Sequence, residues 1–436
     1  MQTSLETLGE LERRLTMSVP VAEIESEIQQ RLTRLAKNVK VAGFRPGKVP
    51  LKMVAQQYGT QVRSDVISDA VKANFADAIR EQNLRIAGNP RIEPRSGGGG
   101  ADALEFSAVF EIYPEVKVGD LSDVTIERPN AEVAPEDVER TVEMLRRQRT
   151  RYEPTDRAAR PGDRVTVDFT GKTDGVEFPG GHARDFPIVL GEGRMLPEFE
   201  TALTGMKAGE TKTFELTFPA DYHGKDVAGK KADFELTAKT VEQGVAPDID
   251  AEFARAFGIA SGSVDELRAE IASNLRLELK RKIEGMVKEQ VFGALRQKAM
   301  FVVPRSLVEA EMQNMMQRMT AEMREQGVKP EDANLDPESV RTGAEARVAL
   351  GLILSEIVRT ENLGPKPEQV KALVQEAAQT YEQPEAVVRW HYEKPERLKD
   401  FEALAIEHNV VDWVLSRARV ADRPAAFTEL MGTRGS

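Results

Sequence analysis

Few side chains in this sequence have the type and spacing that covalent or metal chemistry requires. The chain has no cysteine, and its four histidines stand singly, at His182, His223, His391 and His408. It therefore offers no thiol nucleophile, no disulfide and no cysteine-ligated zinc, and we expect neither a metal nor a cofactor. The patterns GxxxxGK(S/T), HExxH and GxSxG are absent as well. Gly191 and Gly193 do not begin a dinucleotide fingerprint, because Leu196 stands where its third glycine belongs.

Residues 151–243 suit a reaction that needs neither a nucleophile nor a metal. They hold seven of the chain's 17 phenylalanines, and three alternating runs predict strands: Val165-Val167-Phe169, Phe214-Leu216-Phe218 and Phe234-Leu236-Ala238. The barrier to rotation about an Xaa-Pro bond is about 18–20 kcal/mol and arises from amide resonance. The twisted amide has lost that resonance and the dipole that goes with it. A concave aromatic pocket without water would therefore stabilise the twisted amide more than the planar one.

Glycine-rich segments divide this predicted sheet. Asp174-Gly175, Gly180-Gly181 and residues 205–209 indicate turns. A single helix is expected at Leu196–Leu203, with Pro197 in its first turn. We therefore expect a small antiparallel sheet wrapped on one helix.

A basic loop stands out against the overall acidity of the chain. The formal net charge is -12, which disfavours general nucleic-acid binding because an acidic field repels phosphate. From Ile28 to Ser64, however, there is no Asp or Glu, and eight cations fall inside this window. Within it lies a predicted tight turn that presents an aromatic ring and two cations together: Gly43, Phe44, Arg45, Pro46, Gly47 and Lys48. From composition alone, the simpler interpretation is a loop that connects two helices.

Five of the 14 methionines lie on one predicted helix: Met312, Met315, Met316, Met319 and Met323. Methionine is flexible and polarizable, and it is common on surfaces that accept many apolar shapes. The same stripe would also suit a seam between two packed helices. The residues alone leave both interpretations open.

The remaining elements fall into three parts. Apolar spacing predicts a strand ending at Val19, helices over 21–39 and 61–81, and strands over 85–93 and 104–113 around four glycines. A strand over 116–128 and a helix beginning at Pro135 follow, and the arginines at 146–151 suit that helix's C-terminus. From residue 249 the pattern is helical, over 263–299, 304–326, 336–361, 366–380 and 395–420. Long helices with short connections indicate extended antiparallel arms.

Nothing in the sequence indicates a membrane segment. The longest apolar run, Val348–Leu354, is far shorter than a bilayer requires. The first residues carry acids early and have no apolar core, so we expect no secretory signal and a cytoplasmic location.

Four segments of residues 151–243 closely resemble the FKBP-type peptidyl-prolyl isomerase family. They are GDRVTVDFTGKTDGVEF, DFPIVLGEGRMLPEFETALTGMKAGE, FPADYHG and ADFELTAKTVE, in the order of that family. The resemblance implies an isomerase pocket, with Phe199 as its floor, lined by Phe169, Phe178, Phe186, Met195, Leu196, Phe199, Tyr222 and Phe234. Pro179 departs from the pattern, since single-domain relatives carry an acid there. Inhibitor binding of the usual kind is therefore not implied.

The string GFRPGKVP and the order of parts resemble the trigger factor family over essentially the whole chain. This resemblance implies a multi-domain α+β chain with a ribosome-binding α+β domain at 1–112 and a connector at 113–149 that packs with the C-terminal domain. An FKBP-like antiparallel β-sheet domain at 150–243 and an elongated all-α domain with arms at 244–436 follow.

The same resemblance implies the partners. The loop at 43–48 would dock on RNA and protein of the large ribosomal subunit near the exit tunnel. The arms, with the methionine stripe, would form a cradle for nascent and unfolded polypeptides that works without ATP. A weak homodimer away from the ribosome is implied as well, and no membrane.

Two other functions remain open at this point. The chain could be a prolyl isomerase whose helices serve only as a structural spacer. It could also be an RNA-binding translation factor, which its net charge disfavours. We adopt the chaperone with isomerase activity as the hypothesis.

Overall fold

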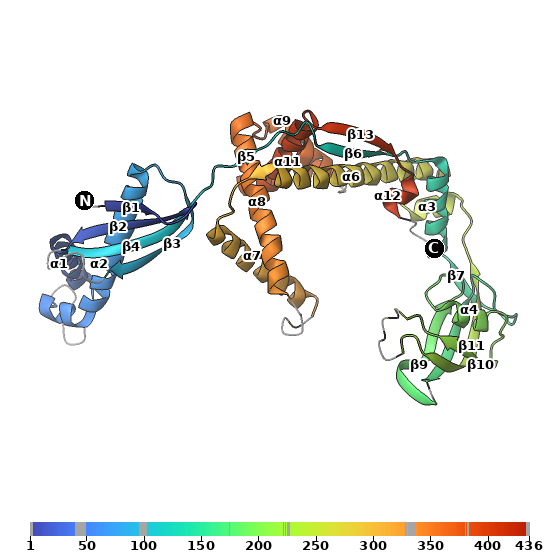
Figure 1. Cartoon of the computed structure of the whole chain (residues 1–436). Helices are drawn as coiled ribbons and strands as arrows, with labels where there is room; N and C mark the ends of the chain where they lie inside the picture. Colours follow the sequence, from blue (N-terminus) through green and yellow to red (C-terminus); the bar gives the residue numbers. More distant parts are fainter. Residues whose placement is uncertain are drawn as a thin grey trace. The chain divides into compact units, whose positions relative to one another are not determined.

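The computed structural model of the chain (Figure 1) describes residues 3–39, 49–95, 103–173, 175–220, 222, 224, 227–327, 329, 336–379, 381 and 383–432. The chain divides into two compact units. The first unit consists of residues 1–126 and 288–420, and the second of residues 127–287 and 421–436. Across the described ranges, no helix combines the length and the apolar character needed to cross a bilayer.

An antiparallel sheet covered by two helices begins the first unit (Figure 1). Its strands, in the order β1-β2-β4-β3, are β1 (Thr3–Thr7), β2 (Glu12–Pro20), β4 (Ala103–Ile112) and β3 (Ile86–Arg95). The helices are α1 (Val21–Asn38) and α2 (Leu51–Glu81). Leu15 and Met17 of β2 pack with Ile24 of α1 in one core, and the rings of Phe75 and Phe110 meet edge-on at 5.4 Å. The alternation predicted up to Val19 and the helix predicted from Val21 are both confirmed.

The predicted start of the second helix, near residue 61, is wrong. α2 begins ten residues earlier, directly after Pro50, whose extended backbone precedes the first turn. Val54 is fully buried in the core, while Gly59 faces open space and is tolerated inside the helix. Strand β1 was not predicted, because all five of its residues are exposed and show no alternation of burial. The four glycines at 97–100 lie outside the described residues.

Glu111 of β4 caps the first turn of another helix, α7 (Arg305–Glu325). Pro304 stands at the N-cap of α7 and makes no side-chain cap hydrogen bond. The Glu111 carboxylate accepts hydrogen bonds from the backbone N–H groups of Arg305 at 3.1 Å and Ser306 at 2.7 Å. These are first-turn donors that a helix cannot satisfy by itself. A negative charge at this end also complements the helix dipole.

Ser306 also contacts strand β3 directly. Its Oγ donates to the carbonyl of Ala87 at 2.8 Å. The neighbouring Gly88 has φ +74, and a Cβ there would lie 2.6 Å from the Cβ of Ser306. Only glycine allows this close approach. The base of α7 is therefore attached to the N-terminal sheet by a carboxylate cap and a backbone contact.

Replacing Glu111 with alanine should lower the free energy of unfolding of the first unit by about 1 kcal/mol, the usual effect of losing a helix cap. Amide exchange at Arg305 and Ser306 should accelerate, because both N–H groups lose their acceptor. Denaturant titration and hydrogen exchange measure the two effects, with the exposed Glu115 changed to alanine as the control. Equal exchange rates in the two variants would contradict the capping role.

Helices make up most of the remaining described residues of the first unit. They include α7, α8 (Pro337–Glu361), α9 (Pro367–Ala378), α10 (Pro384–Tyr392), a 3-10 turn at Pro395–Leu398 and α11 (Lys399–Leu415). α7 packs along α8, where Arg347 pairs with Glu311 at 3.2 Å. Val370, Val374 and Ala405 form a small core between α9 and α11. The helix predicted over 395–420 ends at Leu415, and α10 was not predicted.

Short strands from the connector pair with distant parts of the chain. The single strand predicted over 116–128 is in fact two, β5 (Lys117–Val118) and β6 (Thr125–Asn130). β5 pairs with β12 (Ala299–Met300), and β6 pairs with β13 (Arg419–Pro424). Among the described residues of the C-terminal region, β12 and β13 thus interrupt an otherwise mainly helical chain. The strands that they pair with lie far away in the sequence. No local sequence pattern therefore predicts these pairings.

In the second unit, one group of helices packs around the connector helix. It consists of α3 (Pro135–Gln148), α5 (Ala251–Ala256), α6 (Val264–Lys298) and α12 (Phe427–Met431), with α6 extending into the first unit. Val142, Phe253 and Leu267 lie in their shared core. The arginines at the end of α3 do more than complement its dipole. Arg146 donates to the carbonyl of Pro247 at 2.7 Å, and the Arg149 guanidinium lies 5.1 Å from the centre of the Phe257 ring.

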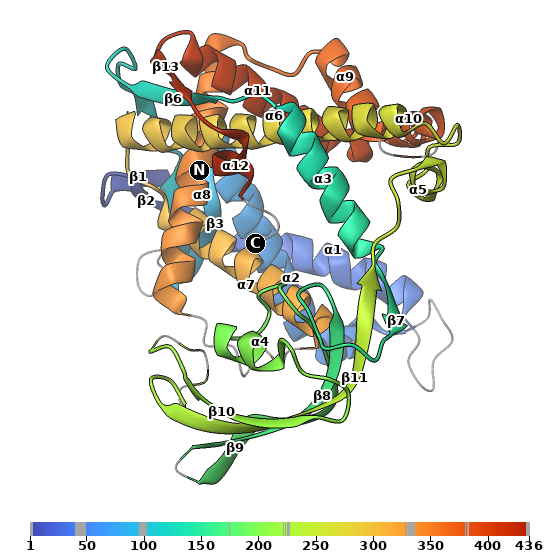
Figure 2. The same ribbon diagram turned by 90° about the vertical axis from the view of Figure 1, so that its right-hand side faces the viewer.

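The other part of the second unit is a five-stranded antiparallel sheet with one short helix, α4 (Pro197–Leu203), on its inner face (Figure 2). The strand order is β10 (Thr211–Thr217), β11 (Lys231–Val245), β8 (Arg164–Thr173) and β9 (Val176–Val189), with β7 (Arg151–Pro154) also paired to β11. This matches the predicted sheet on one helix.

The turn predicted at Gly180-Gly181 is wrong, because both glycines lie inside β9. A Cβ at Gly181 would lie 3.0 Å from the carbonyl oxygen of Gly171 and from the Phe178 ring. Glycine is therefore needed at position 181 because β8 and the Phe178 ring pack too closely to leave room for a side chain.

Candidate functional site

A cluster of aromatic rings lies between α4 and the inner face of this sheet. Phe199 of α4 is at its centre and only 2% exposed. Its ring centroid lies 5.2 Å from that of Phe169, 5.3 Å from that of Phe214 and 5.4 Å from that of Phe234. All three contacts are edge-to-face, the geometry that aromatic quadrupoles favour. Phe199 therefore forms a closed, apolar floor.

The other predicted pocket residues surround this floor. Their side chains range from buried to exposed. Five of them are partly buried and pack against the same core: Phe169, Phe178, Met195, Leu196 and Tyr222. Phe234 is buried. Phe186 is 41% exposed, and its ring lies edge-on to Phe169 at 6.0 Å. The structure thus brings all eight residues together, from a buried floor to an exposed rim.

Three residues that support the cluster were not among the predicted pocket residues. Phe214 lies nearly parallel to Phe234 at 5.8 Å, and Phe218 contacts the ring of Tyr222 at 4.7 Å. Their alternation along the strand already placed them on the inner face. Gly171 is the third, because a Cβ there would lie 2.5 Å from the Phe234 ring. The ring of Phe234 can occupy its position only because Gly171 has no side chain.

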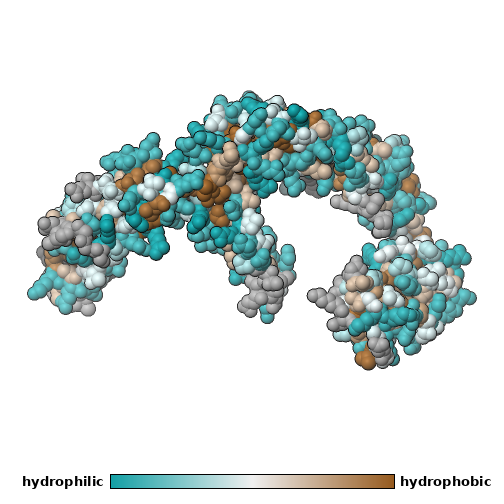
Figure 3. Space-filling model, viewed as in Figure 1, coloured by the Kyte–Doolittle hydropathy of each residue, from teal (hydrophilic) through white to brown (hydrophobic). Residues whose placement is uncertain are grey.

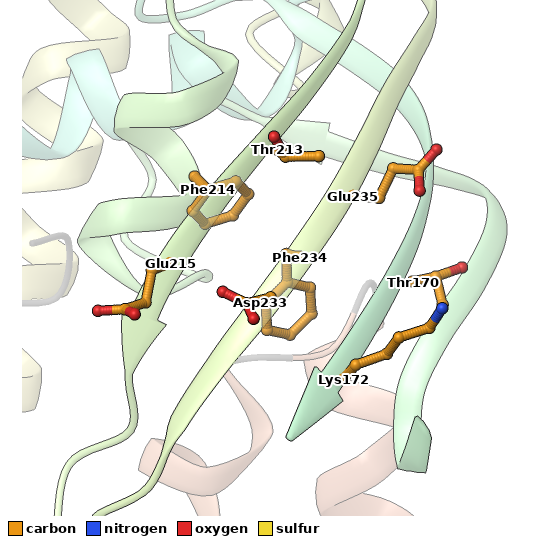
Figure 4. Close-up of a pocket in the computed structure, with 8 residues that line it drawn as sticks. All are labelled: Thr170, Lys172, Thr213, Phe214, Glu215, Asp233, Phe234 and Glu235. Atoms are coloured by element: carbon orange, nitrogen blue, oxygen red, sulfur yellow. The ribbon is translucent and has the colours of Figure 1, made fainter. Parts of the chain in front are cut away.

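A second hollow in this sheet has several charged residues in its lining (Figure 4). It is lined by residues of β8, β10 and β11, namely Thr170, Lys172, Thr213, Phe214, Glu215, Asp233, Phe234 and Glu235. Side chains alternate between the two faces of a strand. The charged residues of this hollow therefore lie on the face opposite the aromatic cluster. A charged, open surface of this kind cannot provide the dry environment that stabilises a twisted amide.

A buried ion pair holds the chain just before β8. Asp163 is 3% exposed and accepts two hydrogen bonds from the Arg157 guanidinium, at 2.6 and 2.8 Å. It also accepts one from the backbone N–H of Arg160 at 2.8 Å. Burial by itself would raise the pKa of the Asp163 carboxyl, but these hydrogen bonds and the charge of Arg157 outweigh it and hold that pKa below its usual range.

The predicted docking loop, residues 43–48, lies outside the described residues. The helices that flank it are described, and two arginines of the acid-free window prove to be paired. Arg31 contacts Glu27 at 3.0 Å and Asp69 at 2.9 Å, and Arg63 contacts Glu25 at 2.8 Å. Acids outside the window therefore neutralise part of its charge.

The methionine stripe is divided between a packed and an exposed side of α7. Met312, Met315, Met319 and Met323 are partly buried, and Gly343 of α8 lies close to Met315, since a Cβ at this glycine would be 3.4 Å from the methionine methyl group. Met316 is 48% exposed. Helix packing therefore accounts for part of the stripe, and Met316 is available at the surface.

A hollow near the base of α7 and α8 continues from this stripe. Its apolar lining is Phe301, Val302, Val303, Val308 and Met312, and charged residues at 305, 309, 341 and 345 surround it. In Figure 3, apolar surface is visible where the upper end of α7 lies beside α8. This is an apolar surface with a polar surround, which is suited to weak contacts with many apolar side chains.

An antiparallel sheet on a single helix, with a buried phenylalanine floor and graded aromatic walls, defines an FKBP-type prolyl isomerase domain within a larger, mainly helical chain. Three family models match the sequence. Residues 1–145 match "Bacterial trigger factor protein (TF)", residues 263–416 match its C-terminus, and residues 155–242 match "FKBP-type peptidyl-prolyl cis-trans isomerase".

Full-length relatives agree with these matches. The chain is 52% identical over 432 residues to trigger factor of Aromatoleum aromaticum, covering 99% of each chain, and 51% identical over 434 residues to trigger factor of Dechloromonas aromatica, covering 100% of each. A solved structure described as "Promiscuous Substrate Recognition in Folding and Assembly Activities of the Trigger Factor Chaperone" is similar in fold, with a TM-score of 0.50 at 18% identity over 95% of this chain and 99% of that one.

The chain belongs to the trigger factor family. It is accordingly a chaperone that carries an FKBP-type peptidyl-prolyl isomerase domain.

Proposed function

We propose that this chain docks on the ribosome in the cytoplasm and, without ATP, shields emerging polypeptides while it isomerises their Xaa-Pro bonds. The aromatic cluster around Phe199 carries the proposal, because it combines a dry floor with an open rim where a proline-containing segment can enter. The eight residues predicted for the pocket are its proposed lining. The proposed boundaries are 1–112 for the ribosome-binding domain, 113–149 for the connector, 150–243 for the isomerase and 244–436 for the cradle.

The docking surface in this proposal is the loop at 43–48. Arg31 of α1 is paired with Glu27 of the same helix and Asp69 of α2, and Arg63 of α2 is paired with Glu25 of α1. Both guanidinium groups therefore have less charge to offer a phosphate backbone. Within the acid-free window, Arg45 and Lys48 are therefore better candidates for contact with ribosomal RNA. Phe44 supplies the apolar face that a ribosomal protein or an unstacked base would contact.

The experiment that tests docking is cosedimentation with ribosomes. The triple variant Phe44→Ala, Arg45→Ala, Lys48→Ala should no longer cosediment, whereas Arg63→Ala should cosediment like the unmodified chain. Arg63 is the matched control, because it is a cation of the same window whose guanidinium is already paired with Glu25. Undiminished cosedimentation of the triple variant would refute the docking assignment.

The same samples distinguish an RNA-binding translation factor. Such a protein would bind free RNA with an affinity that falls steeply as salt is added. The chaperone proposal predicts weak binding to free RNA, because the chain carries a net charge of -12.

The cradle in this proposal comprises the methionine stripe and the apolar hollow at the base of α7 and α8. No nucleotide motif is present to drive release, so clients must be held by small contacts that break readily. The exposed thioether of Met316 suits that need, because a flexible side chain adapts to different partners. A weak homodimer away from the ribosome would cover the same kind of surface.

A further inference from the structure

Two of the pocket's wall residues, Met195 and Leu196, lie on a loop rather than on a strand or helix. This loop runs from the end of β9 to the start of α4. Gly191 and Gly193 within it have φ values of +87 and +66, a backbone conformation that side chains rarely adopt. Leu190, at the start of the loop, is held by backbone hydrogen bonds to Gly162 and Asp163. Gly191 and Gly193 lie beyond this pairing, so their N–H groups need other acceptors.

One carboxylate supplies those acceptors. The Oε2 atom of Glu200 accepts a hydrogen bond from the backbone N–H of Gly191, and its Oε1 atom accepts one from the N–H of Gly193, both at 3.1 Å. Glu200 is partly buried on α4, where each bond to an ionised acceptor is stronger than a neutral one. A single side chain therefore fixes the loop at two points.

Glu200 is also adjacent in sequence to Phe199, the floor of the pocket. The helix that carries the floor therefore also carries the clamp on the wall-bearing loop. Movement of α4 moves both together, so the spacing between floor and wall is set by one rigid element. Leu196 is already tied to α4, because its carbonyl accepts hydrogen bonds from the backbone N–H groups of Phe199 at 2.9 Å and Glu200 at 3.2 Å. The clamp therefore acts on the part of the loop before Leu196, which carries Met195.

We propose that Glu200 is a positioning residue of the isomerase site. It does not contact the proline substrate but holds the 190–196 loop in the shape that the pocket requires. This role rests on the isomerase activity stated above and adds a supporting residue outside the predicted lining. A displacement of about 1 Å in a pocket wall is enough to lower catalysis substantially.

The test compares Glu200→Ala and Glu200→Gln with Glu198→Ala in the full-length chain. Glu198 is the matched control, because it is an exposed carboxylate in the same helical turn. Isomerisation of a proline tetrapeptide gives kcat/KM, NMR hydrogen exchange follows the Gly191 and Gly193 amides, and thermal unfolding reports on stability. We expect kcat/KM to fall about tenfold in Glu200→Ala, with faster exchange at both glycines. Glu198→Ala should match the unmodified chain.

The glutamine variant separates positioning from folding. Its single amide oxygen can replace one of the two acceptors, so kcat/KM and glycine exchange should both lie between those of the alanine variant and the unmodified chain. Unchanged kcat/KM in Glu200→Ala, or a loss without faster exchange at the two glycines, would overturn the proposal. If Glu200→Ala fails to fold, the glutamine variant decides by the same two measurements. An inactive unmodified chain would overturn the isomerase function and this role with it.

Discussion

Replacing Phe199 with alanine should abolish most prolyl isomerase activity and lower the free energy of unfolding of the FKBP-type domain by about 3–5 kcal/mol. The side chain is 2% exposed and packs edge-on against three other rings. Its removal would both lose the apolar transfer energy of a whole ring and leave a cavity beneath the pocket. Peptide isomerisation and denaturant unfolding of the full chain measure the two effects.

A second substitution at position 199 distinguishes the effect of the ring's shape on activity from its effect on the stability of the domain. Phe199→Leu retains most of the buried volume, so the free energy of unfolding should fall by only about 1 kcal/mol. Prolyl isomerase activity should still fall, because the flat aromatic ring is lost. Stability of Phe199→Ala equal to that of the unmodified chain would show that the ring is not the centre of this core.

The same alanine variant distinguishes two functions for the helices. If the helical region is a client cradle, suppression of aggregation of a proline-free client should survive the loss of Phe199. If the chain were an isomerase with a purely structural helical domain, all assistance to refolding should disappear with the isomerase activity. Light scattering of a denatured client, diluted into each variant, gives the comparison.

Replacing Asp163 with asparagine should lower the stability of the FKBP-type domain at pH 7 by roughly 2–3 kcal/mol, because hydrogen bonds from a charged guanidinium are lost at a buried site. The folded-state pKa of Asp163 is depressed relative to its unfolded value. Its stabilising contribution is therefore fully present above the unfolded pKa of about 4 and disappears as the pH falls through the folded pKa.

The pH profile provides the decisive measurement. Urea unfolding between pH 7 and pH 2 should show a loss of stability below about pH 4 in the unmodified chain that is smaller in Asp163→Asn. Asp156→Asn serves as control, since that carboxylate is exposed and its loss should leave the profile unchanged. Parallel profiles for the unmodified chain and Asp163→Asn would show that the ion pair does not contribute to acid sensitivity.

Two of the segments that differ from their sequence-based predictions depend on partners elsewhere in the chain. Gly180 and Gly181 have the composition of a turn, but Gly181 is a glycine because β8 and the Phe178 ring approach it closely. The helix predicted over 395–420 ends at Leu415, and the strand β13 that begins at Arg419 pairs with β6. In each case the deciding contact comes from a segment that a local window does not include.

The candidate site shows the same division. Alternation along β8, β10 and β11 was enough to place the phenylalanines on one face, because side chains in a strand have a period of two. The clamp from Glu200 to Gly191 and Gly193 has no such signature. It depends on the backbone path of the 190–196 loop beside α4, which only the folded structure shows.

By itself, the sequence determined the family and the apolar faces of the main strands and helices, and it supplied the proposal for the aromatic pocket residues. These follow from residue order and short-range periodicity, which act within a few residues. Only the tertiary structure decided which three rings surround Phe199, that Glu111 caps α7, and that Glu200 binds the Gly191 and Gly193 amides. Each of these depends on how separate elements pack, and packing is a property of the whole fold.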